Sequence, residues 1–132
     1  MNNNQKYNLE DRTTEYAKRV IRLCRELPKN SVNNRLSGQA VGSAGSVGAN
    51  YREANDALGD KDFLHRIRIS RKEAKESIHW LELIEEANPE FSMRMQELKK
   101  EGRELKNILS SIIINRQKNI EKQKNKKEEL AV

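Results

Sequence analysis

The residues best placed to do chemistry are four closely spaced cations in the middle of the chain. Steps of three and four residues relate them: Arg68, Arg71, Lys72 and Lys75. On an α-helix this spacing confines the four side chains to an arc of about 100°. From one face they can donate charge-assisted hydrogen bonds to phosphates. The alternative is a solvated helix face whose charge is neutralised by Glu73, Glu76 and Glu82.

A second basic segment lies near the C-terminal end of the sequence. Residues 116–127 contain six cations against one acid, Glu121. As a flexible arm, this segment would bind a nucleic-acid backbone without sequence preference and with strong salt dependence. The cations assigned to that contact are Lys118, Lys122 and Lys124. No aromatic residue is interleaved with them, so no base stacking is predicted there. The alternative is a frayed, solubilising end.

A polar group is predicted where two helices should pack together. Asn50, Arg52 and Glu53 lie in one expected helix and Glu76 lies in the next. Buried polar groups need hydrogen-bond partners. These residues therefore predict a network that fixes helix register or a subunit contact, and the alternative is a ligand or carboxylate site.

The sequence predicts no catalytic site, no metal site and no cofactor. The glycine-rich run lacks the Gly-Lys-Ser/Thr ending of a phosphate-binding loop and follows no predicted strand. His65 and His79 are 14 residues apart, with no His or Cys at ligand spacing. Cys24 lies in an apolar stripe, where we can assign neither the base nor the orienting group that a nucleophile needs. We therefore predict a protein that is not an enzyme.

The scaffold that must position these residues is predicted to be thin and helical. Of the 132 residues, 35% are charged and 5% aromatic, which leaves too few β-branched and aromatic residues to fill a sheet sandwich. The length suits one domain. The net charge of +6 is compatible with nucleic acid, anionic lipid or an acidic partner, and it identifies none of them.

Four segments repeat their apolar residues at the spacing of a helix. The first begins after its cap Asn8 and stops at Pro28, and Ser31 caps the second. Asp60 caps the third, and the proline of residues 88–90 starts the fourth.

Four such helices with short connections most simply form an all-α, antiparallel up-down four-helix bundle. We assign the bundle to residues 1–115 and a basic, frayed C-terminal tail to residues 116–132.

The second of these segments contains an unusual run of glycines: Gly38, Gly42, Gly45 and Gly48. Each glycine costs a helix about 1 kcal/mol relative to alanine, which by itself favours a loop. Their spacing, however, sets small residues along one helical side, where the backbone of another helix can come close. We therefore predict a closely packed helix.

The fourth segment carries more apolar side chains than one core seam needs. Ile113 and Ile114 adjoin Ile112 and widen its stripe, and Ile108 lies one turn earlier. We predict that Ile108, Ile113 and Ile114 form an oligomer interface, so that the chain associates with itself.

A cytoplasmic location is predicted, because the sequence shows no cysteine pair, no secretion signal and no membrane span. Cys24 is the only cysteine, so no internal disulfide forms, as expected in a reducing cytoplasm. The first five residues have no apolar run of the kind found in secretion signals. No segment approaches about 18 consecutive apolar residues, so we expect no membrane partner.

Several motifs of the sequence occur together in one known family. They are Gly42-Ser43-Ala44-Gly45-Ser46-Val47-Gly48-Ala49-Asn50-Tyr51-Arg52-Glu53-Ala54, Lys61-Asp62-Phe63, Glu73-Ala74, Glu76-Ser77, Trp80-Leu81-Glu82-Leu83 and Leu109-Ser110-Ser111-Ile112-Ile113. From about Tyr16 to Arg116, the chain resembles the bacterial four-helix-bundle proteins encoded in intervening sequences of large-subunit (23S) ribosomal RNA genes.

This resemblance implies an up-down bundle that assembles into a ring-like homopentamer. It also implies a relationship to the accessory protein of diversity-generating retroelements, a basic pentamer that binds nucleic acid and a reverse transcriptase. The shared pattern falls on Gln39, Ser46, Asn50, Glu53, Phe63 and Glu76, which adds Gln39 to the predicted polar network. Gly48 replaces a proline common in the family, and a basic residue common near Gly42 is missing. Both departures weaken the transfer of RNA binding.

The sequence thus predicts a self-assembling protein that binds nucleic acid, with RNA as the first candidate. The alternative is a protein-interaction scaffold that docks an acidic partner, or a reverse transcriptase or other protein, without contacting nucleic acid.

Overall fold

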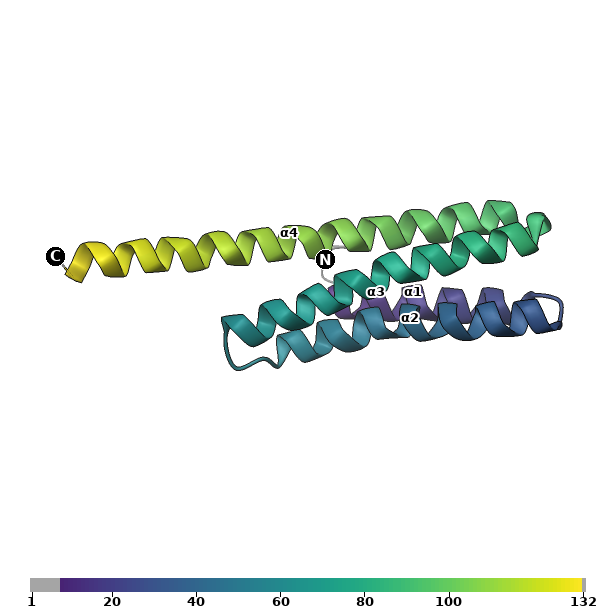
Figure 1. The fold of residues 1–132 in the computed structure, drawn as a ribbon, viewed down its shortest axis with the longest axis horizontal. Helices are drawn as coiled ribbons and strands as arrows, with labels where there is room; N and C mark the ends of the chain where they lie inside the picture. Colours follow the sequence, from purple (N-terminus) through teal and green to yellow (C-terminus); the bar gives the residue numbers. More distant parts are fainter. Residues whose placement is uncertain (1–7, 132) are drawn as a thin grey trace, which may run out of the picture.

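The computed structural model describes residues 8–131, and every regular element in that range is helical. The long helices are α1 (Leu9–Glu26), α2 (Ser31–Asn55), α3 (Asp60–Ala87) and α4 (Ser92–Ala131), and a short 3-10 helix, η2 (Pro89–Phe91), precedes α4. In Figure 1 the helices lie side by side, and the C-terminal part of α4 extends beyond the other three. The predicted all-α class with four helices is confirmed.

Asparagine side chains cap the first two helices. The side chain of Asn8 accepts a hydrogen bond from the backbone N–H three residues on (2.9 Å), as predicted. The cap of α2 is Asn30 rather than Ser31, because Asn30 holds the extended backbone that a cap requires and accepts the corresponding bond at 2.8 Å. In α3, likewise, Gly59 is the cap and Asp60 is already helical. Both predicted starts are one residue off.

Two apolar clusters fill the bundle. The first includes Tyr16, Leu81 and Leu105. The second includes Ile67 and Leu109 and lies toward the connection between α2 and α3. Each cluster joins residues far apart in the sequence, so the amphipathic helices obtain most of their stability from packing on one another.

Buried hydroxyl groups link the helices between these clusters. The hydroxyl of Tyr16 donates to Ser77 Oγ at 2.7 Å, since Ser77 Oγ itself donates to the backbone carbonyl of Ala74. Ser70 Oγ donates to the carbonyl oxygen of Val47 on α2, also at 2.7 Å. Burial raises the pKa of Tyr16 to about 12, so its hydroxyl remains a neutral donor.

The glycine-rich run is helical, as predicted, but close packing explains only one of its glycines. A Cβ on Gly48 would lie 2.9 Å from Thr13 Oγ1 of α1, so α1 and α2 approach each other closely there. A Cβ on Gly38, Gly42 or Gly45 would meet no described atom within 4 Å. For these three, the prediction of close packing is wrong within the chain, because they face away from α1 and α3.

A second close approach involves Gly102 on α4, which no pattern in the sequence distinguishes. A Cβ there would lie 2.7 Å from the hydroxyl oxygen of Tyr16 and 2.9 Å from Cγ1 of Ile78. Gly102 is itself buried. The absence of a side chain therefore allows α4 to lie against both α1 and α3.

The C-terminal segment is helical in the structure, where a frayed tail was predicted. Arg116 donates to Asp60 Oδ1 at 2.7 Å and lies 3.8 Å above the ring of Phe63, which holds α4 against the start of α3. Ile120 still packs against the second cluster. Beyond it, residues 121–131 are exposed. With no proline or glycine after Gly102, nothing in the sequence interrupts a helix that is already formed.

The predicted oligomer interface is also corrected in part. Ile113 is only 4% exposed and belongs to the second cluster of its own chain. Its side chain therefore fills the core and cannot line a subunit contact. Ile114 is 50% exposed and Ile108 is half-buried, so these two remain on the surface.

Candidate nucleic-acid interface

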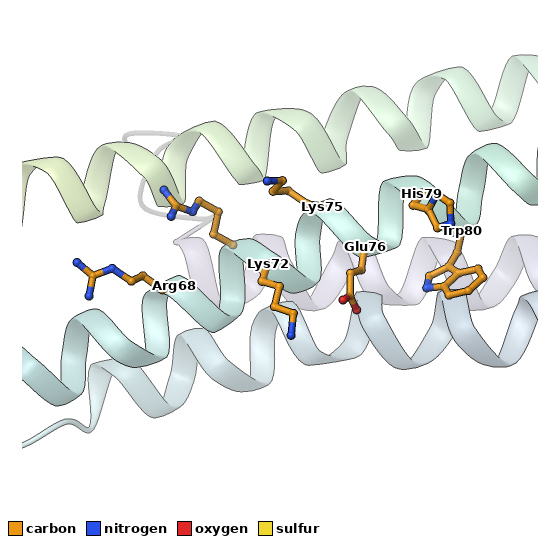
Figure 2. A pocket seen from close by; sticks show the side chains of 7 residues that line it. Arg68, Lys72, Lys75, Glu76, His79 and Trp80 are labelled. Carbon is orange, nitrogen blue, oxygen red and sulfur yellow. The ribbon is translucent and has the colours of Figure 1, made fainter.

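The predicted cations of α3 line one shallow groove on the outside of the bundle. The groove has a volume of about 430 Å³ and is lined by Arg68, Arg71, Lys72, Lys75, Glu76, His79 and Trp80. Figure 2 shows six of these side chains, labelled, along the outer side of α3. The structure thus brings together all four cations that the helical spacing selected, and it adds one acid and two aromatic residues.

The packing of α3 explains why this face is free. Ile67, Ser70, Ala74, Ser77 and Leu81 are all less than 1% exposed and turn inward. The side chains on the opposite side of the helix must therefore face solvent. Arg68, Lys72 and Lys75 are exposed and Arg71 is half-buried.

The four groove cations have no ion-pair partner among residues 8–131. Elsewhere in that range six cations do have carboxylate partners within 4.0 Å: Arg12, Arg22, Arg52, Arg94, Lys99 and Arg116. The acids Glu73, Glu76 and Glu82 were the alternative explanation of the cationic face, yet none of them pairs with it. The groove therefore keeps four cations without an ion-pair partner among the described residues, against the single carboxylate that lines it, that of Glu76.

Glu73 forms no ion pair with the groove cations, although one of them influences its pKa. Burial raises the pKa of Glu73, and the neighbouring charge of Glu76 raises it further. Ser46 of α2 and the charge of Lys72 act in the opposite direction. Glu73 therefore lies near Lys72 without pairing with it.

The aromatic end of the groove was missed from the sequence. The rings of His79 and Trp80 meet edge to face, with centroids 5.0 Å apart and planes inclined at 62°. Trp80 packs partly against the first apolar cluster, and His79 is exposed. The signal was present, because steps of four residues continue from Lys72 through Glu76 to Trp80.

Glu76 and His79 stand three residues apart on the same helix, which is a spacing that metal sites use. No third metal-ligating side chain joins them within the described part of the chain. In that same part, no helix is long and apolar enough to cross a membrane.

The lysines of the C-terminal segment do not reach the groove. Lys118, Lys122 and Lys124 are exposed on the C-terminal part of α4, and the last two lie beyond Ile120, which still packs against the second cluster. That end of α4 extends past the other helices (Figure 1). They form a separate basic surface, while the groove is lined by residues 68–80 of α3 alone.

Within the described chain, the residues of the predicted polar network do not hydrogen-bond to one another. Arg52 instead donates to Glu10 Oε1 of α1 at 2.8 Å, and Asn50 bonds the carbonyl oxygen of Ser46 on its own helix at 2.9 Å. Gln39 and Glu53 are exposed, and Glu76 lies in the groove. As a network that fixes helix register within the chain, the prediction is wrong, because these α2 residues point toward α1 or solvent and do not converge on α3. Their role in a subunit contact stays a prediction.

Buried polar contacts are found elsewhere, at the end of the bundle where α2 begins. The side chains of Asn33 and Asn88 exchange two hydrogen bonds, of 2.9 and 2.8 Å. Asn33 also donates to the carbonyl oxygen of Pro28, and Asn88 to that of Ile84. These asparagines are 3% and 2% exposed, so the pair joins the start of α2 to the end of α3.

An ion pair ties α3 to α4 near the same end. Lys99 Nζ donates to Glu85 Oε1 at 2.7 Å, and Ser92 and Gln96 donate to the other carboxylate oxygen. These hydrogen bonds, that of Lys99 first, lower the pKa of Glu85 to about 2. Both the asparagine pair and this ion pair are structural, and neither lines the groove.

Comparison with known proteins identifies the family. Residues 5–111 match the family model described as 23S rRNA-intervening sequence protein. No functionally curated protein is significantly similar to the chain. A crystal structure of a protein of unknown function from the S23 ribosomal protein family of Bacteroides thetaiotaomicron is similar in fold, with a TM-score of 0.72 and 30% sequence identity. The alignment covers 80% of this chain and 98% of that one. The resemblance seen in the sequence motifs is thereby confirmed, and the chain belongs to the family of 23S rRNA-intervening sequence proteins.

Proposed function

We propose that this chain is a non-enzymatic assembly protein that binds nucleic acid, RNA in the first instance, through the groove of α3. The observation that carries this proposal is the set of four cations that line one groove without carboxylate partners among the described residues. Phosphates are the natural counter-charges for such a set, because neutralising them releases condensed counterions. The exposed lysines of the α4 extension add a second contact of the same kind.

The family name agrees with this proposal in one respect. The matching model describes proteins of intervening sequences in 23S ribosomal RNA, so an RNA is the first ligand to test. The solved relative is of unknown function.

Reversing the charge of two groove lysines should remove most of the binding. We expect Lys72→Glu combined with Lys75→Glu to lower the affinity for RNA at least about tenfold at about 50 mM salt, and to lower the salt slope by about two. The measurement is a salt titration with structured RNA, single-stranded RNA and duplex DNA, on protein whose solution mass and helicity match those of the wild type.

The matched control is the pair Lys18→Glu and Lys29→Glu, which makes the same change in net charge on exposed residues outside the groove. An equal loss of affinity in both pairs would show that net charge, not the groove, holds the RNA. No binding of any nucleic acid by well-assembled wild-type protein would favour the protein scaffold, which docks an acidic partner or a reverse transcriptase.

We further propose that the chain, as an antiparallel up-down bundle, assembles into a homo-oligomer, a pentamer in the family resemblance. The outer face of α2 supports this. Gly38, Gly42 and Gly45 are exposed there, and a Cβ on each would meet open space. Exposed glycines destabilise a helix by about 1 kcal/mol each. A second chain packed closely on this face would offset that cost.

A large side chain on this face should prevent assembly. We expect Gly42→Arg to convert the oligomer to monomers and to leave the helical content unchanged, because the monomer has room for the side chain. Light scattering on the variant and on Gln117→Arg, an exposed control on α4, measures this. An oligomer of unchanged mass in Gly42→Arg would exclude the glycine face from the subunit contact.

A further inference from the structure

We infer that the groove of α3 takes a single strand of nucleic acid, and that one unpaired base stacks on the aromatic pair of Trp80 and His79 at its end. The inference rests on the proposed function, since it names the form of nucleic acid that the same groove accepts. It begins from the order of residues along the groove: cations line its first part, from Arg68 to Lys75, and aromatic rings close it.

The shape of the groove suits an extended strand. Figure 2 shows Lys72, Glu76 and Trp80 on the side of α3 toward α2, and Lys75 and His79 toward α4. Because α3 rises about 1.5 Å per residue, the distance along the helix from Arg68 to Trp80 is about 18 Å. That length accommodates a few successive nucleotides, with phosphates beside the cations at one end and a base beside the rings at the other.

The aromatic pair of Trp80 and His79 can stack with an unpaired base but not with the bases of a duplex. Trp80 is anchored by its packing against the first apolar cluster, and His79 meets it edge to face and is exposed. Bases stack on such rings with little sequence preference, because every base has a π-face. In a duplex those faces are already stacked on one another, so only an unpaired base can engage the rings.

The position of Glu76 supports the same arrangement. Its carboxylate lies between the cations and the aromatic pair, and it is the one acidic side chain that lines the groove. A phosphate at this point would be repelled, whereas the exocyclic amino group of a base donates to a carboxylate. A strand that follows the groove therefore passes from phosphate contacts to base contacts near Glu76.

The single tryptophan makes this directly measurable in the wild-type protein. Trp80 is the only tryptophan of the chain, so its fluorescence reports on this end of the groove alone. We expect single strands of about 10 nucleotides, whether RNA or DNA, to quench the emission of Trp80 on binding. An abasic strand with the same number of phosphates should bind about tenfold more weakly and leave the emission unchanged, and duplex RNA should also leave it unchanged.

Three variants test the role of the two rings. Trp80→Phe keeps an aromatic face and should retain affinity within about threefold, whereas Trp80→Leu keeps an apolar side chain on the cluster and should lose about tenfold. His79→Ala, at an exposed position, should weaken binding without loss of thermal stability.

The outcomes separate this inference from the function on which it rests. Equal affinity for the abasic and the normal strand, with unchanged emission of Trp80, would overturn base stacking and leave phosphate binding intact. Failure of every nucleic acid to bind would overturn the proposed function itself. A preference for RNA over DNA among single strands would identify the 2′-hydroxyl as a further contact.

Discussion

Replacing Gly102 with alanine should lower the free energy of unfolding by about 2 kcal/mol. The added Cβ would lie 2.7 Å from the hydroxyl oxygen of Tyr16 and 2.9 Å from Cγ1 of Ile78. Tyr16 cannot move aside cheaply, because it is fully buried and bonded to Ser77. Overpacking of this kind costs about 3 kcal/mol, and the better helix propensity of alanine returns about 1 kcal/mol.

The measurement is urea unfolding of this variant and of Arg103→Ala, the exposed neighbour on the same turn of α4. The control should change stability by no more than about 0.5 kcal/mol. A more stable Gly102→Ala protein would mean that α4 lies farther from α1 and α3 than the structure places it.

Replacing Asn33 with alanine should have a larger effect, a loss of about 3 kcal/mol of stability. The change removes the two hydrogen bonds exchanged with Asn88 and the bond to the carbonyl oxygen of Pro28. The side-chain oxygen of Asn88 would remain buried without that donor, and an unsatisfied buried polar group costs about 1–3 kcal/mol beyond the cavity left behind.

Asn34→Ala is the matched control, since Asn34 is the exposed neighbour in the same turn of α2. Combining Asn33→Ala with Asn88→Ala provides a further test. The double variant should be less destabilised than the sum of the two single variants, because each single change already breaks the shared bonds. Additive effects would show that the two asparagines are not coupled in solution.

The helices could be read from the sequence because their evidence is local. The apolar stripes of α1, α3 and α4 and the cap at Asn8 depend on residues within a few turns of each other. The same holds for the cations of the groove, which share a face of α3 by spacing alone.

Contacts between residues that are distant in the sequence could not be predicted. The pairing of Asn33 with Asn88, the approach of Tyr16 to Gly102 and the turn of Arg52 toward α1 each depend on which helix lies opposite. The periodicity of apolar residues identifies the buried face of a helix, but it does not identify the helix that packs against that face. For the same reason, the lack of carboxylate partners for the groove cations among residues 8–131 could be established only from their surroundings in the fold.

The outward glycines of α2 also constrain the order of folding. A segment with four glycines among Gly38–Gly48 is a poor helix nucleus, because nucleation is unfavourable even for alanine-rich chains. α3 and α4 have no glycine except Gly102 and are joined by a short connection, so we expect their hairpin to form early, through contacts local in sequence. We expect α2 to become helical later, against the surface that this hairpin provides.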